Sequence, residues 1–215
     1  MKKTLALAVT AAFLATPAYA ADVKIGVLLG FTGPIESLTP DMASGAELAM
    51  KEASDSSAFM GGSKIISVRG DSTCVDAAAA TATAERLITA DGVSAIMGAD
   101  CSGVTTAVLQ NVALAKGVVM ISPSATSPAL STVEDNGLFF RTSPSDARQG
   151  QVLAKILKEK GVKSAAISYT NNDYGKGLAA SIQSNFEGLG GKVTISTSHE
   201  DGKGDYGAEI AALAQ

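Results

Sequence analysis

The stretch VKIGVLLGFTGP, residues 23–34, decides the fold. Residues 23–29 are almost uniformly apolar, which is typical of a strand that is buried on both faces of a parallel sheet. Gly30, Gly33 and Pro34 then favour a turn, and a helical pattern follows over residues 41–53. A buried strand, a turn and a helix in this order predict the first unit of an α/β fold.

The same alternation continues along the rest of the chain. We expect further strands at residues 64–69, 93–97, 118–121 and 138–141, with helices at 77–89 and 102–116. After a break near residues 141–144 the pattern restarts, with helices at 146–160, 175–189 and 206–215 and strands at 164–169 and 192–198. Strands separated by helices predict parallel sheets covered on both faces. We therefore expect an α/β protein with two lobes, residues 21–141 and 142–215, joined by a crossover.

The last helical stretch, residues 206–215, is amphipathic but has no glycine cap and no strand after it. We therefore expect the second lobe to be partial and the chain to be a fragment of a longer protein.

Residues 1–20 are typical of an export signal. Lys2 and Lys3 precede an apolar run at residues 4–14, which is too short to span a bilayer as a helix. Ala18 and Ala20 then stand at the small-residue positions that signal peptidase reads. A buried first helix is the alternative interpretation. We expect cleavage after Ala20 and a mature protein in the periplasm.

The charge balance argues against a nucleic-acid partner. The chain has 17 Lys and Arg and 21 Asp and Glu, and two of the lysines lie in the predicted signal. The mature chain therefore has 15 basic and 21 acidic residues and a net charge of −6. An acidic chain without a basic run lacks the electrostatic footprint of a nucleic-acid-binding protein.

Cys74 and Cys101 are the two cysteines of the sequence. In an oxidising periplasm such a pair favours a disulfide, and the loop that it closes would contribute ~3.5 kcal/mol of stability. Two separate buried thiols are the alternative. The pair is a poor metal site because the one histidine, His199, is far away in sequence. We expect no metal and no cofactor.

Three loops follow strands and so lie where ligands of open α/β sheets bind, beside helix N-termini. They are residues 98–103, 122–128 and 171–177. Ser102 can cap the helix that it starts and, with the free amides there, hold a carboxylate. The second loop is rich in hydroxyl groups, and the third can present the ring of Tyr174 opposite the other two. Each loop also has a plainer interpretation, as a helix cap, a turn or packing.

An enzyme is the competing class of protein. Gly26, Gly30 and Gly33 do not have the spacing of a dinucleotide fingerprint, and the sequence has no Walker A motif and no G-x-S-x-G elbow. His199 has no evident nucleophile partner and fits a surface position. Residues 201–205 only loosely match a calcium loop, and a glycine-rich turn is the better interpretation. No residue nominates a reaction, so we expect no enzymatic activity.

Several short motifs occur together. They are VKIGV at 23–27, TGP at 32–34, SGA at 44–46, DGV at 91–93, MG at 97–98, CS at 101–102, ISPSATSP at 121–128, FRT at 140–142 and DYGKG at 173–177. In this combination the chain resembles the branched-chain amino acid-binding family, the Leu/Ile/Val-binding type of periplasmic receptor. The resemblance covers nearly all of the mature chain and implies the type I periplasmic-binding fold. That fold has two doubly wound parallel-sheet lobes that close about a hinge on one ligand.

The resemblance also implies a set of ligand contacts. Ser102 matches the serine that binds the ligand's α-carboxylate. The backbone of Ser124, beside Ala125, stands where the ligand's main-chain groups are met, and Thr126 matches a threonine that contacts both carboxylate and ammonium. Tyr174 matches a tyrosine that the second lobe brings to the cleft. The acidic residue that receives the ammonium group in this family lies beyond residue 215.

The resemblance further implies that Cys74 pairs with Cys101. Two positions depart from the family pattern. Leu38 stands where leucine-binding members often have an aromatic residue, and Asp100 stands where they have an apolar one. The Asp100 carboxylate is expected either to pair with a ligand cation or to be solvated. These departures bear on leucine itself more than on an amino-acid-like ligand.

These observations predict a non-enzymatic periplasmic receptor that binds an amino acid, branched-chain or otherwise hydrophobic or neutral, and delivers it to the membrane permease of an ABC transporter. We expect one small-molecule ligand and a monomer. The alternatives are the same fold with an aromatic acid, amide or urea as ligand, or a receptor that serves a chemosensor. A cytoplasmic repressor is excluded because an export signal occupies the place of its DNA-binding segment.

Overall fold

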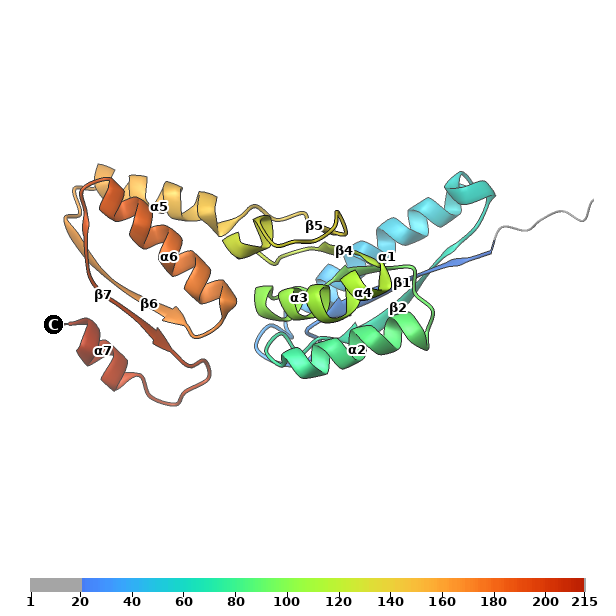
Figure 1. The fold of residues 1–215 in the computed structure, drawn as a ribbon, viewed down its shortest axis with the longest axis horizontal. Helices are drawn as coiled ribbons and strands as arrows, with labels where there is room; N and C mark the ends of the chain where they lie inside the picture. Colours follow the sequence, from blue (N-terminus) through green and yellow to red (C-terminus); the bar gives the residue numbers. More distant parts are fainter. Residues whose placement is uncertain (1–20, 215) are drawn as a thin grey trace, which may run out of the picture.

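The computed structural model describes residues 21–214, so the predicted export signal lies outside the described residues. The chain forms two parallel sheets with helices packed against them, which confirms the α/β prediction (Figure 1). The first lobe is the larger of the two and is built on a five-stranded sheet of order β2-β1-β3-β4-β5. Its strands are β1 (Val23–Leu29), β2 (Ile65–Asp71), β3 (Ala95–Gly98), β4 (Val119–Ser122) and β5 (Phe139–Arg141).

Helices cover both faces of the first sheet. They are α1 (Thr39–Asp55), α2 (Ala77–Thr89), and the continuous helical run α3 (Ser102–Val108), η2 (Leu109–Ala113) and α4 (Leu114–Lys116), with short turns η1 (Phe59–Gly61) and η3 (Pro128–Ser131). Val27 and Leu29 face α1, whereas Leu28, between them, faces α2 and α3. This alternation explains why β1 has to be apolar at successive positions.

The strand order places a topological switch between β1 and β3, because the chain passes from β1 to β2 on one side and to β3 on the other. Ligands of doubly wound sheets bind beyond the carboxyl ends of the strands at such a point. The predicted binding loops at residues 98–103 and 122–128 follow β3 and β4 and so lie at this edge.

The second lobe has a parallel strand pair, β6 (Ser164–Thr170) and β7 (Lys192–His199). The helices α5 (Asp146–Glu159) and α6 (Asp173–Gly188) pack together beside this pair, and α7 (Gly207–Leu213) lies on its other side (Figure 1). The two helices approach closely at Gly150, where a Cβ atom would lie 2.1 Å from Ser181 Oγ. The division of the chain at residue 141 stays a prediction.

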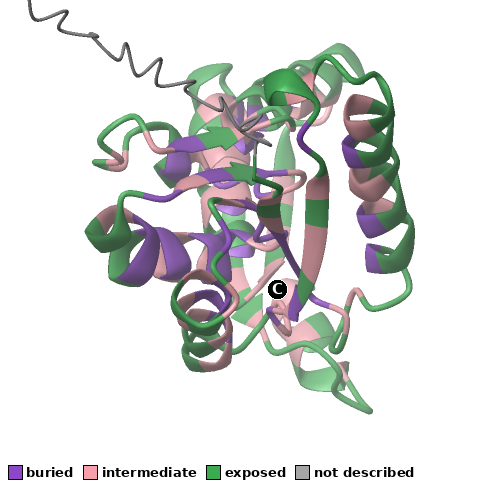
Figure 2. Cartoon of the chain, turned by 90° about the vertical axis from the view of Figure 1, so that its right-hand side faces the viewer, coloured by how far each residue is buried: buried purple, intermediate pink, exposed green. Residues whose placement is uncertain are grey.

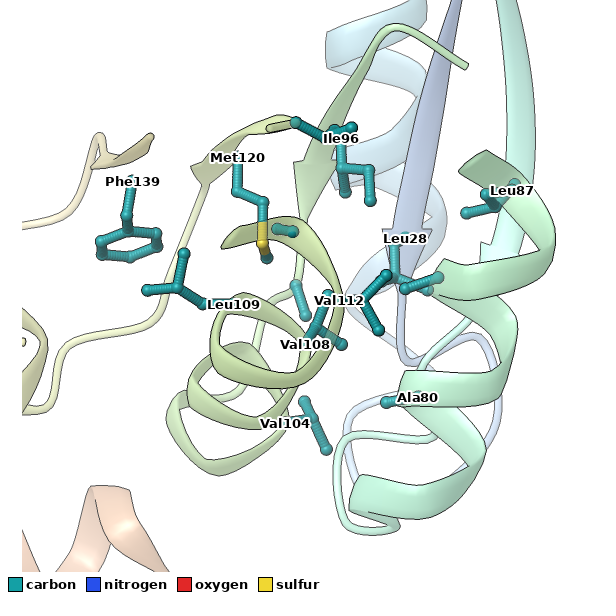
Figure 3. Packing of buried hydrophobic residues seen from close by; sticks show 14 of the residues in the cluster. Leu28, Ala80, Leu87, Ile96, Val104, Val108, Leu109, Val112, Met120 and Phe139 are labelled. Carbon is teal, nitrogen blue, oxygen red and sulfur yellow. The ribbon is translucent and has the colours of Figure 1, made fainter. Parts of the chain in front are cut away.

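Most of the hydrophobic core lies in the first lobe. In Figure 3, Leu28, Ile96 and Met120 of the strands face Val108 and Val112 of the helical run, and none of these five side chains is more than 2% exposed. Full burial of such a side chain contributes about 1.5–3 kcal/mol. Figure 2 shows the buried residues gathered between the first sheet and its helices. This core fixes the loops at the carboxyl edge of the sheet.

Several predicted boundaries differ from the structure in detail. The first helix begins at Thr39 because Pro40 fits the first turn of a helix. The predicted helix 102–116 contains a π-helical turn, η2, and the 3-10 turn η3 begins at the last residue of the predicted binding loop 122–128. The apolar periodicity locates such helices but does not reveal which hydrogen-bond spacing a turn uses.

Candidate functional site

A disulfide joins Cys74, in the loop after β2, to Cys101, directly before α3, with 5.2 Å between their Cα atoms. The predicted pairing is therefore confirmed. The bond holds two loops together at the carboxyl edge of the first sheet. Gly98, at the end of β3, has a φ of 135°, and a Cβ atom there would lie 2.0 Å from the backbone oxygen of Leu28. Only glycine lets β1 and β3 approach this closely at the start of the site.

Asp100 lies at the centre of this edge and is 1% exposed. Its Oδ2 accepts a 2.6 Å hydrogen bond from the Gly30 amide, and its Oδ1 accepts from the Ser72 hydroxyl and the Cys101 amide, both at 3.0 Å. The prediction that this carboxylate is solvated is wrong. A buried carboxylate requires hydrogen-bond donors, and Asp100 finds them in the loops after β1 and β2. It therefore acts as a structural anchor for those loops, and the structure gives no support for a contact with a ligand cation.

Ser102 is the first residue of α3, and Cys101 occupies the cap position. The prediction that Ser102 caps the helix is wrong, because its Oγ bonds to a different loop. This Oγ accepts hydrogen bonds from the amides of Thr126, at 3.2 Å, and Ser127, at 3.1 Å. A hydroxyl group has two lone pairs and one proton. Both lone pairs of Ser102 are used, so the proton is what it can offer to a ligand.

The loop after β4 is held by its own serines. The Ser122 hydroxyl accepts from the Ala125 amide at 2.9 Å, and the Ser124 hydroxyl donates to the backbone oxygen of Asp100 at 2.9 Å. The side chain of Ser124 is therefore directed at the protein, and its amide donates to Ser122 Oγ at 3.4 Å. The family resemblance implies that the backbone of Ser124 meets the ligand, and this stays a prediction. Ala125 is completely buried, so it can shape the floor of a site but does not present a surface.

Arg141, the last residue of β5, fixes the far side of the same loop. Its Nη1 donates to the backbone oxygens of Ala125, at 3.2 Å, and Ser127, at 2.9 Å, and its Nη2 donates to the Ser131 hydroxyl, at 2.5 Å. Burial lowers the pKa of this guanidinium from its ordinary value, partly opposed by the charge of Asp146. Because these donors are bonded to the loop, Arg141 holds the loop in place. The sequence patterns did not single out Arg141 as a site residue, although a lone arginine that ends a short strand is a usable signal.

Asp146, the first residue of α5, links the loop to the second lobe. Its amide donates a 2.9 Å hydrogen bond to the backbone oxygen of Thr126. Its side chain is 1% exposed, and its Oδ2 is buried without a hydrogen-bond partner among the described residues. Burial raises the pKa of this carboxyl, while the Thr126 hydroxyl and the Arg141 charge act to lower it. The sequence does not mark Asp146 as a site residue, because an acid in the first turn of a helix is ordinary.

Helix α6 brings the second lobe to the edge of the first. The Asn172 side chain caps it by accepting from the Gly175 amide at 2.8 Å. A Cβ atom at Gly103 would lie 3.8 Å from the Asp173 carboxylate, and one at Gly177 would lie 2.8 Å from Pro128 Cδ. Tyr174, beside these contacts, is 42% exposed. Tyr174 is thus open to solvent, and its contact with a ligand stays a prediction.

One hollow in the described part of the chain adjoins these contacts between the lobes. It measures about 650 Å³ and lies between η3, α5 and α6, with Ser127, Pro128, Asp173 and Lys176 in its wall. Ser102, Thr126 and Tyr174 do not line it. The hydrogen-bonded edge of the first sheet carries the polar groups that a ligand needs, so we place the candidate site there. Leu38, 60% exposed, stands apart from those hydrogen bonds.

Among residues 21–214, no group of three or more His, Cys, Asp or Glu side chains is arranged to hold a metal ion. In the same part of the chain, no helix has the length and apolar character that crossing a membrane requires.

Comparison with curated proteins gives relatives over nearly the whole chain. The Leu/Ile/Val-binding protein of Citrobacter freundii is 31% identical over 201 residues, which are 93% of this chain and 53% of that protein. The Leu/Ile/Val/Thr-binding protein of Salmonella typhimurium is 30% identical over 212 residues, 98% of this chain and 57% of that protein. The chain spans about half the length of the curated relatives that it matches.

Solved structures give the same fold. A leucine-binding protein from Thermotoga maritima matches with a TM-score of 0.78 and 26% identity over 89% of this chain and 53% of that one. A branched-chain amino acid transporter substrate-binding protein from Streptococcus pneumoniae, solved with isoleucine, matches with a TM-score of 0.77 and 28% identity over 90% of this chain and 54% of that one. A solute-binding protein from R. palustris, solved with benzoate, has a TM-score of 0.78 over 90% of this chain and 52% of that one, and its 22% identity bears on the fold alone.

Residues 22–215 match the family model described as periplasmic binding protein. This match covers all but the first 21 residues, and the parallel sheets and the disulfide agree with it. The chain belongs to the periplasmic binding protein family, a family of non-enzymatic solute-binding proteins.

Proposed function

We propose that this chain serves as an exported receptor that binds a free amino acid, branched-chain or otherwise hydrophobic or neutral, between its two lobes. The receptor delivers its ligand to the membrane permease of an ABC transporter and works as a monomer. The relatives that bind leucine, isoleucine and valine support this ligand class, and so do the solved leucine- and isoleucine-binding proteins.

The observation that carries the proposal is the state of the Ser102 hydroxyl. Its oxygen already accepts from two amides of the loop after β4, so its proton is the part of this hydroxyl left to donate to a ligand. A carboxylate is the acceptor that gains most from such a donor in a closed cleft, because hydrogen bonds to charged groups are the stronger ones. The site thus meets the ligand's negative charge with neutral donors, since the donors of Arg141 described above are held by the loop.

Substitution of Ser102 tests this proposal. Ser102→Ala removes the donor and leaves two loop amides without their acceptor, so affinity for leucine, isoleucine or valine should fall by roughly 1–3 kcal/mol in titration calorimetry. Ser44→Ala is the matched control, because that hydroxyl bonds only to the backbone oxygen of Pro40 on the exposed side of α1. Unchanged affinity of the Ser102 variant would move the site elsewhere.

The same fold with an aromatic acid as ligand is the second candidate. A hydroxyl that donates to a carboxylate, such as that of Ser102, suits both amino acids and aromatic acids. The two ligand classes therefore differ at the ammonium group, which only the amino acids have. Calorimetry of the full-length protein against the branched-chain amino acids, 4-hydroxybenzoate and urea separates the two candidates. Binding of 4-hydroxybenzoate without binding of any amino acid would replace our proposal by this alternative.

Export is the remaining part of the proposal. Residues 1–20 have the features of a signal peptide, and we propose that cleavage after Ala20 releases the mature protein into the periplasm. The intact mass of the protein from a periplasmic extract should correspond to a chain that starts at Ala21 and contains no free thiol. A mass that includes residues 1–20 would contradict export by this route.

A further inference from the structure

Asp173, the first residue of α6, places a carboxylate of the second lobe at the edge of the first sheet. Figure 1 shows the start of α6 beside α3, and these two helices are in contact. A Cβ atom at Gly103 would lie 3.8 Å from the carboxyl carbon of Asp173 and 3.8 Å from its Oδ2. Gly103 directly follows Ser102, whose hydroxyl is the proposed donor to the ligand's carboxylate. A negative charge of the second lobe therefore faces the segment that is proposed to bind the negative end of the ligand.

The charge of Asp173 is not neutralised by a direct contact. Among residues 21–214, its carboxylate takes part in no hydrogen bond and no ion pair. Lys176, on the next turn of α6, lines the same hollow as Asp173, but the two side chains form no ion pair in this described part of the chain. Both residues are exposed, so solvent screens them in the structure. Closure of the lobes on a ligand removes water and strengthens the interaction of Asp173 with any charge in the cleft.

Two other charged side chains at this edge are already bonded elsewhere. Asp100 is buried, and each of its hydrogen bonds comes from a neutral donor. The guanidinium of Arg141 donates to the loop after β4 and to Ser131. Neither side chain is bonded to Asp173, so Asp173 is the charged group that the second lobe contributes here without a partner among the described residues.

We propose that Asp173 is a specificity-determining residue that selects ligands by net charge, disfavouring anionic acids and accepting zwitterionic amino acids. A plain carboxylic acid brings only a negative charge to Ser102, and like charges repel. In an amino acid, the ammonium group is bonded to the carbon that carries the carboxylate and offsets this repulsion. Specificity can come from repelling the wrong ligand as well as from binding the right one. This inference rests on the proposed function, in which Ser102 binds the ligand's carboxylate.

The test compares leucine with 4-methylpentanoate, which is leucine without its amino group, in the full-length protein at pH 7. Asp173→Asn removes the charge and nearly keeps the shape. It should strengthen 4-methylpentanoate binding about threefold or more, because the repulsion is lost, and change leucine affinity by less than about twofold. Direct calorimetry and displacement of bound leucine measure the two affinities.

Two further measurements separate a charge effect from a change of structure. Asp173→Glu restores the charge and should keep the parent's preference for leucine over 4-methylpentanoate. High salt should reduce this preference in the parent and leave it unchanged in Asp173→Asn, because salt screens the repulsion.

Glu187→Gln is the matched control, since Glu187 is an exposed acid near the other end of α6, about 21 Å along the helix axis from Asp173. It should leave both affinities unchanged. Equal changes for the two ligands in Asp173→Asn would show a merely structural role and overturn the inference. If the parent binds leucine and Asp173→Asn binds 4-methylpentanoate no more tightly than the parent, even below detection in both, the inference alone fails. If the parent binds 4-methylpentanoate but no amino acid, both the amino-acid proposal and this inference fail.

Discussion

The two lobes differ in how their strands are buried. In the first lobe, the second half of β1 is completely enclosed: Val27, Leu28 and Leu29 are each 0% exposed. In the second lobe, exposure alternates along the whole of β7, and no residue of either β6 or β7 is fully buried. The first sheet is thus the middle of three layers. In the described second sheet, one face is largely exposed.

The difference extends to the cores. Among the described residues of the second lobe, the buried apolar ones are Ala154, Ala179 and Phe186, and only Phe186 is large. The first lobe also supplies Ser102, Ser124 and Thr126 of the candidate site, on loops held by the disulfide, Asp100 and Arg141. We infer that the first lobe is the rigid part that defines the ligand site and that the second lobe, in this chain, depends on a few contacts.

Removing the largest of those contacts should break the second lobe alone. The Phe186 ring is 1% exposed and packs so closely on the backbone of Gly191 that a Cβ atom there would lie 2.4 Å from it. Phe186→Ala should cost about 3–5 kcal/mol. In residues 21–215, hydrogen exchange should then show lost protection of the β6 and β7 amides, while β1, β3 and β4 keep theirs.

Phe140→Ala is the control for this prediction, because the Phe140 side chain is 54% exposed and its removal should leave exchange unchanged. Loss of protection in both lobes of the Phe186 variant would show that they unfold as one unit and would refute the comparison.

Loss of the disulfide should act on the other lobe. Cys74 and Cys101 are separated by 27 positions, and opening such a loop costs ~3.5 kcal/mol in the chain-entropy model. A Cys74→Ser and Cys101→Ser double variant should unfold its first lobe at lower urea concentration, with little change in the exchange of β6 and β7. Equal stability with and without the bond would mean that Asp100 and its donors hold these loops without help.

The sequence predicted the first lobe well because its strands are continuous apolar runs between turns, a pattern that few other structures produce. It also predicted which loops meet at the sheet edge, since parallel strands fix that geometry. It did not predict the roles of individual polar groups. Ser102 can cap its own helix or bind the loop of Thr126. The outcome depends on how close the fold brings two residues that are 24 positions apart in sequence, and no local sequence pattern contains that information. The buried state of Asp100 depends likewise on Gly30 and Ser72, which belong to other loops.

The contact between the lobes should be sensitive to a single methyl group. A Cβ atom at Gly177 of α6 would lie 2.8 Å from Pro128 Cδ on η3, so Gly177→Ala should force the lobes apart. Overpacking of this kind costs about 1–3 kcal/mol, which should appear as weaker ligand binding and as a less compact ligand-bound form in small-angle scattering.

Gly188→Ala is the matched control on the same helix, because no atom lies within 4 Å of the added Cβ. It should leave affinity unchanged. Equal affinity of the Gly177 variant and the parent would show that the lobes bind ligand without this contact.

The smallest expected difference between the lobes is in the stability lost when one ion pair is removed from each. In the first lobe, Glu47 of α1 accepts from Nε and Nη2 of Arg69 on β2, both at 2.7 Å, and from the Ser67 hydroxyl at 3.0 Å. The bonds from Arg69 hold the pKa of Glu47 below its ordinary value of 4.5. A carboxyl with a lowered pKa in the folded state stabilises the protein above its ordinary pKa, and this contribution is lost as the pH falls through the lowered value. Because the two side chains are 30% and 47% exposed, Glu47→Gln should cost only about 0.5–1 kcal/mol at pH 7. The difference from the parent should shrink on acidification and in high salt.

In the second lobe, Lys155 and Glu159 lie 3.8 Å apart, with side chains 74% and 64% exposed, and Glu159→Gln should change nothing measurable at any pH. Equal effects of the two substitutions in urea denaturation would mean that the bidentate bond between α1 and β2 adds no rigidity to the first lobe beyond that of its core.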